Sequence, residues 1–283
     1  MAVLSAGLLA GSCASGGNSR ETAALETSKH SQQKTGNAAF AVYSEELRIP
    51  LWNELPPALT VKTSPILTIK LECTDFAASP AEIPEQVFNS VLYRGLNVRD
   101  YARELVRVQT IEYQEMGEEA RNNPAIINSA SLNWEYSEYM ETPVAGPRLL
   151  VISRDRAFYK GGAHPNSDRT YFVFDREAAR QIRLSDIIRK ESEPALKQVV
   201  NRELRAGKNL GPGDSLKNGS FFVDEAELPE DFFLSPQGLG FHWNPYEIAP
   251  YSEGHVETLV SSGDIRAFLS PGGQRLTGEL WKD

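Results

Sequence analysis

The sequence predicts an α+β protein in which an antiparallel meander sheet carries helices segregated to one face. Three observations lead to this prediction. Apolar and polar residues alternate in consecutive short segments between residues 131 and 184, apolar residues recur at helical spacing in three longer segments, and no regular strand–helix–strand alternation is present. Consecutive strands with short links favour antiparallel pairing.

Composition sets broad limits on function. Of the 283 residues, 41% are hydrophobic, as in ordinary soluble domains, and the net charge is −9. An acidic chain does not favour a nucleic-acid partner, which calls for a basic face, but it attracts basic partners over short distances. The two cysteines, Cys13 and Cys73, cannot form a zinc site of the usual spacing. We expect no metal and no other cofactor, and we expect Cys73 to be a buried thiol in a strand.

The first residues resemble an export signal. Residues 1–12 form a short apolar run with small residues, too short to span a membrane, and predict a lipoprotein signal peptide. Residues 9–13 (Leu-Ala-Gly-Ser-Cys) resemble a bacterial lipobox, which implies cleavage before Cys13 and lipidation of its sulfur. The run departs from the pattern because it begins without Lys or Arg, and a disordered apolar N-terminus is the alternative.

Residues 13–39 are small and polar and predict a flexible tether. These features predict a cell-envelope protein that lies outside the cytoplasm and touches the membrane only through its lipid.

Residues 40–145 are expected to form an N-terminal α+β region. Segments 40–43 and 66–71 are β-branched or alternating and predict strands, and four prolines interrupt the chain between them. Segment 82–93 predicts a helix with Pro84 in its first turn and Gly95 beyond its end. Segment 98–119 predicts a longer helix with an apolar stripe.

Residues 146–271 are expected to form a second region. Strands are predicted at residues 131–137, just before this region, and within it at 148–153, 170–175, 180–184, 221–223, 232–234, 239–243 and 255–260. A helix is predicted from a Ser192 cap to a Gly207 stop, and a helical turn at residues 264–269. Residues 272–283 are predicted to be a tail.

Two stretches offer candidate ligand-binding residues. Residues 159–166 (Tyr-Lys-Gly-Gly-Ala-His-Pro-Asn) combine flexible glycines with a histidine held extended by the following proline. The candidates here are Tyr159, Gly161, Gly162 and His164. The histidine is either presented to a ligand or hydrogen-bonded to its own turn.

The second stretch, residues 241–255, contains two Pro-Tyr pairs and several aromatic residues. Aromatic rings give large contact area at low entropy cost, so they are suited to a recognition groove. Packing of this loop against the sheet is the alternative. The candidates are Trp243, Tyr246, Tyr251 and His255.

Four segments, 159–164, 171–175, 184–188 and 245–251, occur in an order that resembles a known family. They are similar to the RsiV-like C-terminal extracytoplasmic domain, domain of unknown function 3298, found in the lysozyme-responsive anti-sigma factor RsiV and the peptidoglycan deacetylase PdaC. The resemblance covers roughly residues 145–270, with a weaker resemblance to the companion domain before it. It implies an α+β fold in a cell-wall context, and it carries over no catalytic residue.

We therefore expect a non-enzymatic binding module that recognises a basic lysozyme-like protein or a cell-wall glycan such as peptidoglycan. A structural envelope lipoprotein is one alternative. The other is a metal- or His-dependent hydrolase acting on cell-wall glycan, which would require histidines and a carboxylate to converge in a pocket. Its candidate residues are His164, His242, His255, Asp168, Asp175 and Glu247.

Overall fold

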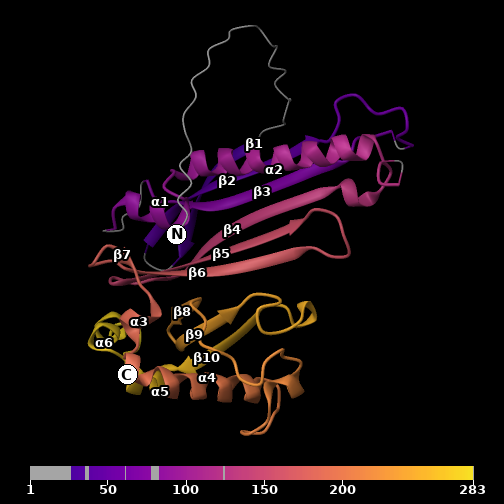
Figure 1. The fold of residues 1–283 in the computed structure, drawn as a ribbon. Helices are drawn as coiled ribbons and strands as arrows, with labels where there is room; N and C mark the ends of the chain where they lie inside the picture. Colours follow the sequence, from indigo (N-terminus) through magenta and orange to yellow (C-terminus); the bar gives the residue numbers. More distant parts are fainter. Residues whose placement is uncertain (1–26, 36–37, 61, 78–82, 124, 283) are drawn as a thin grey trace, which may run out of the picture.

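A computed structural model describes residues 27–35, 38–60, 62–77, 83–123 and 125–282 of the chain. Two sheets lie one above the other, with helices on the outer side of each (Figure 1). The α+β class is confirmed. The predicted signal peptide and the lipidation candidate Cys13 lie outside the described residues. Among those residues, no helix has the length and hydropathy needed to span a bilayer.

The large sheet has seven strands in the order β1-β2-β3-β4-β5-β6-β7. Its strands are β1 (Thr27–Thr35), β2 (Ala38–Pro50), β3 (Ile66–Asp75), β4 (Trp134–Ala145), β5 (Leu149–Tyr159), β6 (Asn166–Asp175) and β7 (Arg180–Gln181). Strands β4 to β7 form the predicted antiparallel meander. Strands β3 and β4 are parallel instead, because two helices, α1 (Glu85–Leu92) and α2 (Val98–Arg121), carry the chain back across the sheet.

The central strands are buried on both faces. On β5, Leu150 and Ile152 pack with Phe88 of α1 in one core, while Leu149 and Val151 belong to a second core on the other side. Successive side chains of a strand point to opposite faces, so an uninterrupted apolar run indicates a strand covered on both sides. The second cover is the C-terminal part of the chain.

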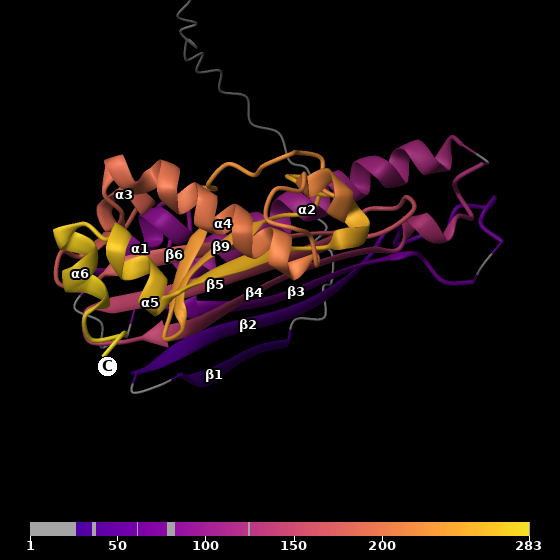
Figure 2. The same ribbon diagram turned by 90° about the horizontal axis from the view of Figure 1, so that it is seen from below.

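This C-terminal part contains a three-stranded antiparallel sheet in the order β10-β9-β8. Its strands are β8 (Phe232–Ser235), β9 (Gly238–Trp243) and β10 (Val256–Ser261). Helix α4 (Glu193–Gly207) packs against β10, and Figure 2 shows it in front of the small sheet with the large sheet behind. The shorter helices are α3 (Leu184–Ile187), α5 (Ser262–Ile265) and α6 (Pro271–Thr277), and 3-10 turns occur at Ala130–Leu132, Lys190–Ser192, Leu216–Gly219, Tyr251–Glu253 and Arg266–Phe268.

Five features differ from the predictions. The strand predicted at residues 180–184 ends at Gln181, and Leu184 begins α3. The expected tether includes β1, because an edge strand needs only main-chain hydrogen bonds to a neighbour. The expected tail includes α6 and the buried Trp281, whose indole donates to the Ser235 carbonyl at 2.7 Å. Ser192 precedes α4 without a side-chain cap. Residues 221–223 form no strand, and Phe221 is instead buried in the second core.

The boundary between residues 145 and 146 stays a prediction. Strands β4 and β5, on either side of it, are neighbours in one sheet.

Candidate functional site

The loop between β5 and β6 is shaped by its glycines. Gly161 and Gly162 have φ angles of +83° and +104°, which favour glycine. A Cβ atom on Gly161 would lie 2.9 Å from the carbonyl oxygen of Ser131, so this loop passes close to another backbone. The Tyr159 hydroxyl donates to the Gly162 carbonyl at 3.1 Å. These three candidates therefore set the shape of the loop that presents His164.

Three aromatic rings meet at the surface beside this loop, and we call His164, Tyr246 and Tyr251 the aromatic stack. The His164 and Tyr251 rings lie 3.9 Å apart between centroids at an angle of 20°. Tyr246 continues the stack, 5.9 Å from Tyr251 and at 28°. Its hydroxyl lies 3.4 Å from His164 Nε2, and the residue is 54% exposed. The fold therefore brings together three predicted candidates from segments far apart in the sequence.

The loop that carries the two tyrosines is held to the large sheet. Asn244 accepts a hydrogen bond from the Arg169 amide at 2.7 Å and donates to the Arg169 carbonyl at 3.1 Å. The Glu247 carboxylate accepts from the Asn244 amide at 2.9 Å. Tyr246 has a φ of +73°, unusual for a residue with a side chain, and its amide donates to the Ala249 carbonyl at 3.0 Å. These contacts hold the two tyrosines in place without a ligand.

The other two candidates lie elsewhere. Trp243 is 3% exposed and packs in the second core. His255 precedes β10 and faces His242 of β9, with the two rings 5.3 Å apart. Neither residue belongs to the aromatic stack.

His255 belongs to a hydrogen-bonded chain of four side chains, Asp231, His242, His255 and Ser167, which we call the relay. Asp231 Oδ2 lies 2.8 Å from His242 Nδ1, and His242 Nε2 lies 3.1 Å from His255 Nδ1. His255 Nε2 lies 3.0 Å from the Ser167 hydroxyl on β6. The Tyr171 amide donates to the second Asp231 oxygen at 2.7 Å. The relay therefore crosses from the small sheet to the large one.

The relay becomes more exposed along its length. His242 has no exposed surface, whereas His255 and Ser167 are half-buried. Burial lowers the pKa of His255, as do the neighbouring His242 and Arg169. His255 is therefore a neutral base at pH 7, at the accessible end of the chain.

The acids expected to join the histidines do not do so among the described residues. Asp168 pairs with Arg156 at 2.8 Å, and Asp175 pairs with Arg275. Glu247, as described above, binds the Asn244 amide. His164 stacks on Tyr251 rather than meeting His255.

Sequence reasoning missed Asp231 and Ser167. Asp231 lies 11 residues from the histidine that it binds, and Ser167 lies 88 residues from His255. No local spacing indicates either contact. The adjacency of Ser167 to the Gly-Gly-Ala-His loop was the available signal, because residues next to a shaped loop often share its surface.

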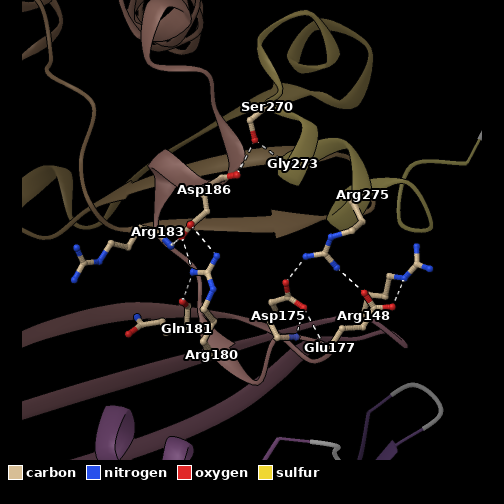
Figure 3. Close-up of polar contacts among 11 residues, drawn as sticks. Arg148, Asp175, Glu177, Arg180, Gln181, Arg183, Asp186, Ser270, Gly273 and Arg275 are labelled. Atoms are coloured by element: carbon tan, nitrogen blue, oxygen red, sulfur yellow. Dashed lines mark hydrogen bonds and ion pairs between the residues drawn. The ribbon is translucent and has the colours of Figure 1, made fainter.

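The other end of β6 carries a second polar network (Figure 3). Asp175 accepts from the amides of Glu177 and Ala178, both at 3.0 Å, and from Arg275. Arg275 also donates to Glu177 at 2.6 Å. Burial alone would raise the pKa of Asp175, but the Ala178 amide and the Arg275 guanidinium outweigh it and hold the pKa below its ordinary value.

The same network reaches α3. Arg180 binds Asp186 through two nitrogens, at 2.8 and 2.9 Å, and this hydrogen bonding lowers the pKa of Asp186. The Ser270 hydroxyl donates to the Asp186 carbonyl at 2.7 Å. Every acid in Figure 3 therefore faces a guanidinium, which indicates a contact that joins the C-terminal part to the sheet.

A third polar cluster is sealed inside the first core. Glu138 has no exposed surface and accepts hydrogen bonds from Tyr101 at 2.9 Å and Tyr136 at 3.0 Å. Arg154 lies 3.5 Å from it. Cys73 is buried there as a free thiol, as predicted, and burial raises its pKa, which makes it unreactive.

The described part of the chain has no group of three histidine, cysteine, aspartate or glutamate residues arranged to hold a metal ion. The relay supplies imidazoles, a carboxylate and a hydroxyl instead. Groups of this kind can pass a proton along a hydrogen bond.

Solved structures show the same fold. A member of the DUF3298 family from Bacteroides fragilis is 22% identical and has a TM-score of 0.70, with 88% of this chain and 99% of that chain covered. A DUF3298 family protein from Pseudomonas aeruginosa is 15% identical, with a TM-score of 0.52 and coverage of 92% and 96%. At these identities the likeness concerns the fold. No curated protein matches the chain.

The family comparison agrees with the structures. Residues 185–262 match the model described as "Protein of unknown function (DUF3298)". The match runs from α3 to the start of α5 and includes three of the four relay residues. Ser167 and His164 precede it. Over residues 185–262 the chain is therefore similar to the DUF3298 family.

Proposed function

We propose that this chain is an extracytoplasmic, lipid-anchored binding module that holds a cell-wall glycan against the aromatic stack. The observation that carries the proposal is the alignment of three rings at the surface, from two loops, with Tyr246 54% exposed. A pyranose ring presents an apolar C–H face, which packs against an aromatic face. Prepositioned tyrosines lose little side-chain entropy on binding.

The held loop supports this function. Asn244 attaches the loop to β6, and Tyr246 adopts a left-handed backbone conformation that costs free energy. An exposed ring in such a conformation gains nothing from core packing. Its position is therefore better explained by contact with a ligand.

Binding to insoluble peptidoglycan tests the proposal. We expect the full chain to co-sediment with the polymer, and Tyr246→Ala and Tyr251→Ala to weaken binding at least about tenfold, since an aromatic contact contributes roughly 1.5 kcal/mol or more. Phe222→Ala is the matched control, because Phe222 is 50% exposed and has no ring contact with the stack. Equal sedimentation of all four proteins would overturn the proposal.

A basic lysozyme-like protein is the second candidate ligand, favoured by the net charge of −9. Calorimetry of the same protein with a basic lysozyme, at low and moderate salt, separates the two. If lysozyme gives a heat of binding and the protein does not sediment with peptidoglycan, the ligand is a protein rather than a glycan.

The lipid anchor has its own test. Cys13→Ala is expected to move the protein from the membrane fraction to the soluble fraction, because a diacylglycerol supplies the membrane affinity. Cys73→Ala is the control, since that thiol is buried. Unchanged membrane association of the Cys13 variant would contradict lipidation.

A further inference from the structure

We propose that Ser167 is an activated nucleophile that cleaves carboxylic esters, with His255 as its general base and with Asp231 and His242 as positioning residues. The unbroken chain of contacts, 2.8, 3.1 and 3.0 Å long, leads from a carboxylate to a hydroxyl. Nucleophile, base and orienting acid within hydrogen-bond reach are the arrangement that acyl transfer requires.

The direction of the protons follows from one group that can only accept. A carboxylate only accepts hydrogen bonds, so a His242 ring with a single proton carries that proton on Nδ1, facing Asp231. Its Nε2 is then an acceptor, and His255 must donate from Nδ1. His255 Nε2 is left with a lone pair directed at the Ser167 hydroxyl. The whole chain is therefore set to remove the serine proton.

The charges around His255 keep it in the basic form. His242 of β9 and Arg169 of β6 face it and lower its pKa, in addition to burial. Asp155 of β5 and Glu257 beside it in β10 act in the opposite direction. Arg169 forms ion pairs with both Asp155 and Glu257, at 2.6 and 3.1 Å. These pairs reduce the extent to which the two acids raise the pKa of His255. The net effect is a pKa below the ordinary 6.5.

The neighbours of Ser167 on β5 and β4 line a cavity. Ser137, Ala157 and Ser167 are in register across β4, β5 and β6, so their side chains share one face of the sheet. Ser137 and Ala157 line a cavity of about 220 Å³, together with Tyr139 and Pro165. Neighbouring strands are ~4.8 Å apart, so an acyl group beside Ala157 would lie about one strand spacing from Ser167.

The aromatic stack lies near the same end of β6. His164 precedes Ser167 by three residues, and Tyr251 precedes His255 by four. An O-acylated sugar would rest on the stack with its acyl group in the cavity. This choice of substrate class depends on the proposed glycan binding, whereas the reactivity of Ser167 does not.

The reaction balances without a further reactant except water. The Ser167 oxygen bonds to the ester carbonyl carbon, and its proton passes to His255 Nε2. The carbon–oxygen bond to the sugar breaks, and His255 returns the proton to the leaving alcohol. Water then attacks the acyl-serine with His255 again as base, which releases a carboxylic acid and restores the serine.

The positive charge that forms on His255 is stabilised through its hydrogen bond to His242, which stays bound to the Asp231 carboxylate. The proton of His242 does not need to move. The two positioning residues act by orientation and electrostatics.

The test uses the full chain with a fluorophosphonate probe and p-nitrophenyl acetate. We expect one covalent label, located on Ser167 by peptide mass spectrometry. Hydrolysis should rise with pH through a single ionisation below 6.5 and be constant above it, because only neutral His255 is a base. Ser167→Ala should remove the label and lower hydrolysis at least about hundredfold. Ser185→Ala, at an exposed serine of α3, should change neither.

Asp231→Asn tests the positioning role. An asparagine can donate a hydrogen bond to His242 Nδ1. Donor and acceptor then exchange places in every hydrogen bond of the relay, and His255 Nε2 carries a proton directed at the serine. Labelling should fall at least about hundredfold while thermal unfolding stays cooperative. Glu230→Gln is the neighbouring control. Label on another residue, or full labelling of Ser167→Ala or Asp231→Asn, overturns the proposal and makes the relay a purely structural contact.

Acetate release from O-acetylated peptidoglycan separates this proposal from the glycan-binding function. Labelling of Ser167 without sedimentation or acetate release supports the nucleophile and overturns the glycan. Sedimentation without labelling supports the binding module and overturns the nucleophile. Labelling, sedimentation and acetate release together support both.

Discussion

The two ends of β6 both carry charged side chains into the boundary between the sheets, but they differ in what those charges can do. At the Asp175 end, guanidinium groups meet carboxylates, and neither partner changes charge near neutral pH (Figure 3). At the Ser167 end, two imidazoles stand between a carboxylate and a hydroxyl. Imidazoles gain and lose protons near pH 6.5. One end is built as a fixed attachment, and the other can move a proton.

The two ends of β6 also differ in how deeply their polar side chains are buried. Asp175 has no exposed surface and has three hydrogen-bond donors around it. Ser167 is half-buried, and its partner on β5, Ala157, lines a cavity. A fully satisfied buried acid contributes to stability, whereas a half-exposed hydroxyl contributes little and stays available for reaction.

The largest expected effect is at the attached end. Asp175→Ala should lower the free energy of unfolding by about 3 kcal/mol, because two backbone amides and a guanidinium lose their acceptor. Urea unfolding at pH 7 measures it. Asp168→Ala on the same strand is the control, with an expected loss below about 1 kcal/mol, since its pair with Arg156 is partly exposed. Equal losses would remove the distinction between the two acids.

A smaller loss of stability is expected from the start of the relay. Asp231→Ala should lower the free energy of unfolding by about 2 kcal/mol, because the buried His242 and the Tyr171 amide lose their partner. Glu230→Ala provides the comparison in urea unfolding. A loss in the Asp231 variant no greater than in this control would show that the relay does not hold the sheets together.

The two ends should also respond to pH in different ranges. The folded pKa of His255 lies below 6.5, so the unfolded chain binds its proton first and stability falls as the pH drops below about 6.5. The folded pKa of Asp175 lies below 3.8, so its stabilisation is present above that value and is lost as the pH falls through the folded pKa.

Unfolding midpoints between about pH 7.5 and about pH 3 distinguish these contributions. His255→Asn should remove the part of the loss that begins near 6.5, and Arg275→Gln should reduce the part at the acidic end. A wild-type protein with constant stability from pH 7 to pH 5 would argue against the lowered pKa of His255.

The smallest effect on stability is expected at Ser167. Ser167→Ala should change the free energy of unfolding by less than about 1 kcal/mol, because one hydrogen bond of a half-buried hydroxyl is lost. Thermal unfolding of the variant beside Ser137→Ala measures it. A loss as large as that of Asp231→Ala would assign Ser167 to the attachment rather than to chemistry.

Most of the elements could be predicted because their signals are local. The apolar stripe of α2 and the alternation along β4 are patterns within one segment, and they depend only on helical and strand periods. Strand β1 and helix α6 have no such signal. A polar edge strand is set by its neighbour, and the short α6 is set by burial of Leu276 and Trp281.

The site was predictable in part for the same reason. Rigid Pro-Tyr turns and paired glycines indicated the loops that carry His164, Tyr246 and Tyr251. They did not indicate that the rings would stack.

The sequence by itself determined most of the segments that become helices, strands and shaped loops, since backbone preference and hydrophobic period are properties of consecutive residues. The tertiary structure alone decided that Asp231, His242, His255 and Ser167 form one chain of hydrogen bonds. That arrangement depends on the register of β9 with β10 and on the placement of the small sheet over β6. A shift of one residue in either strand would turn the histidines to the opposite face, and no short stretch of sequence encodes that choice.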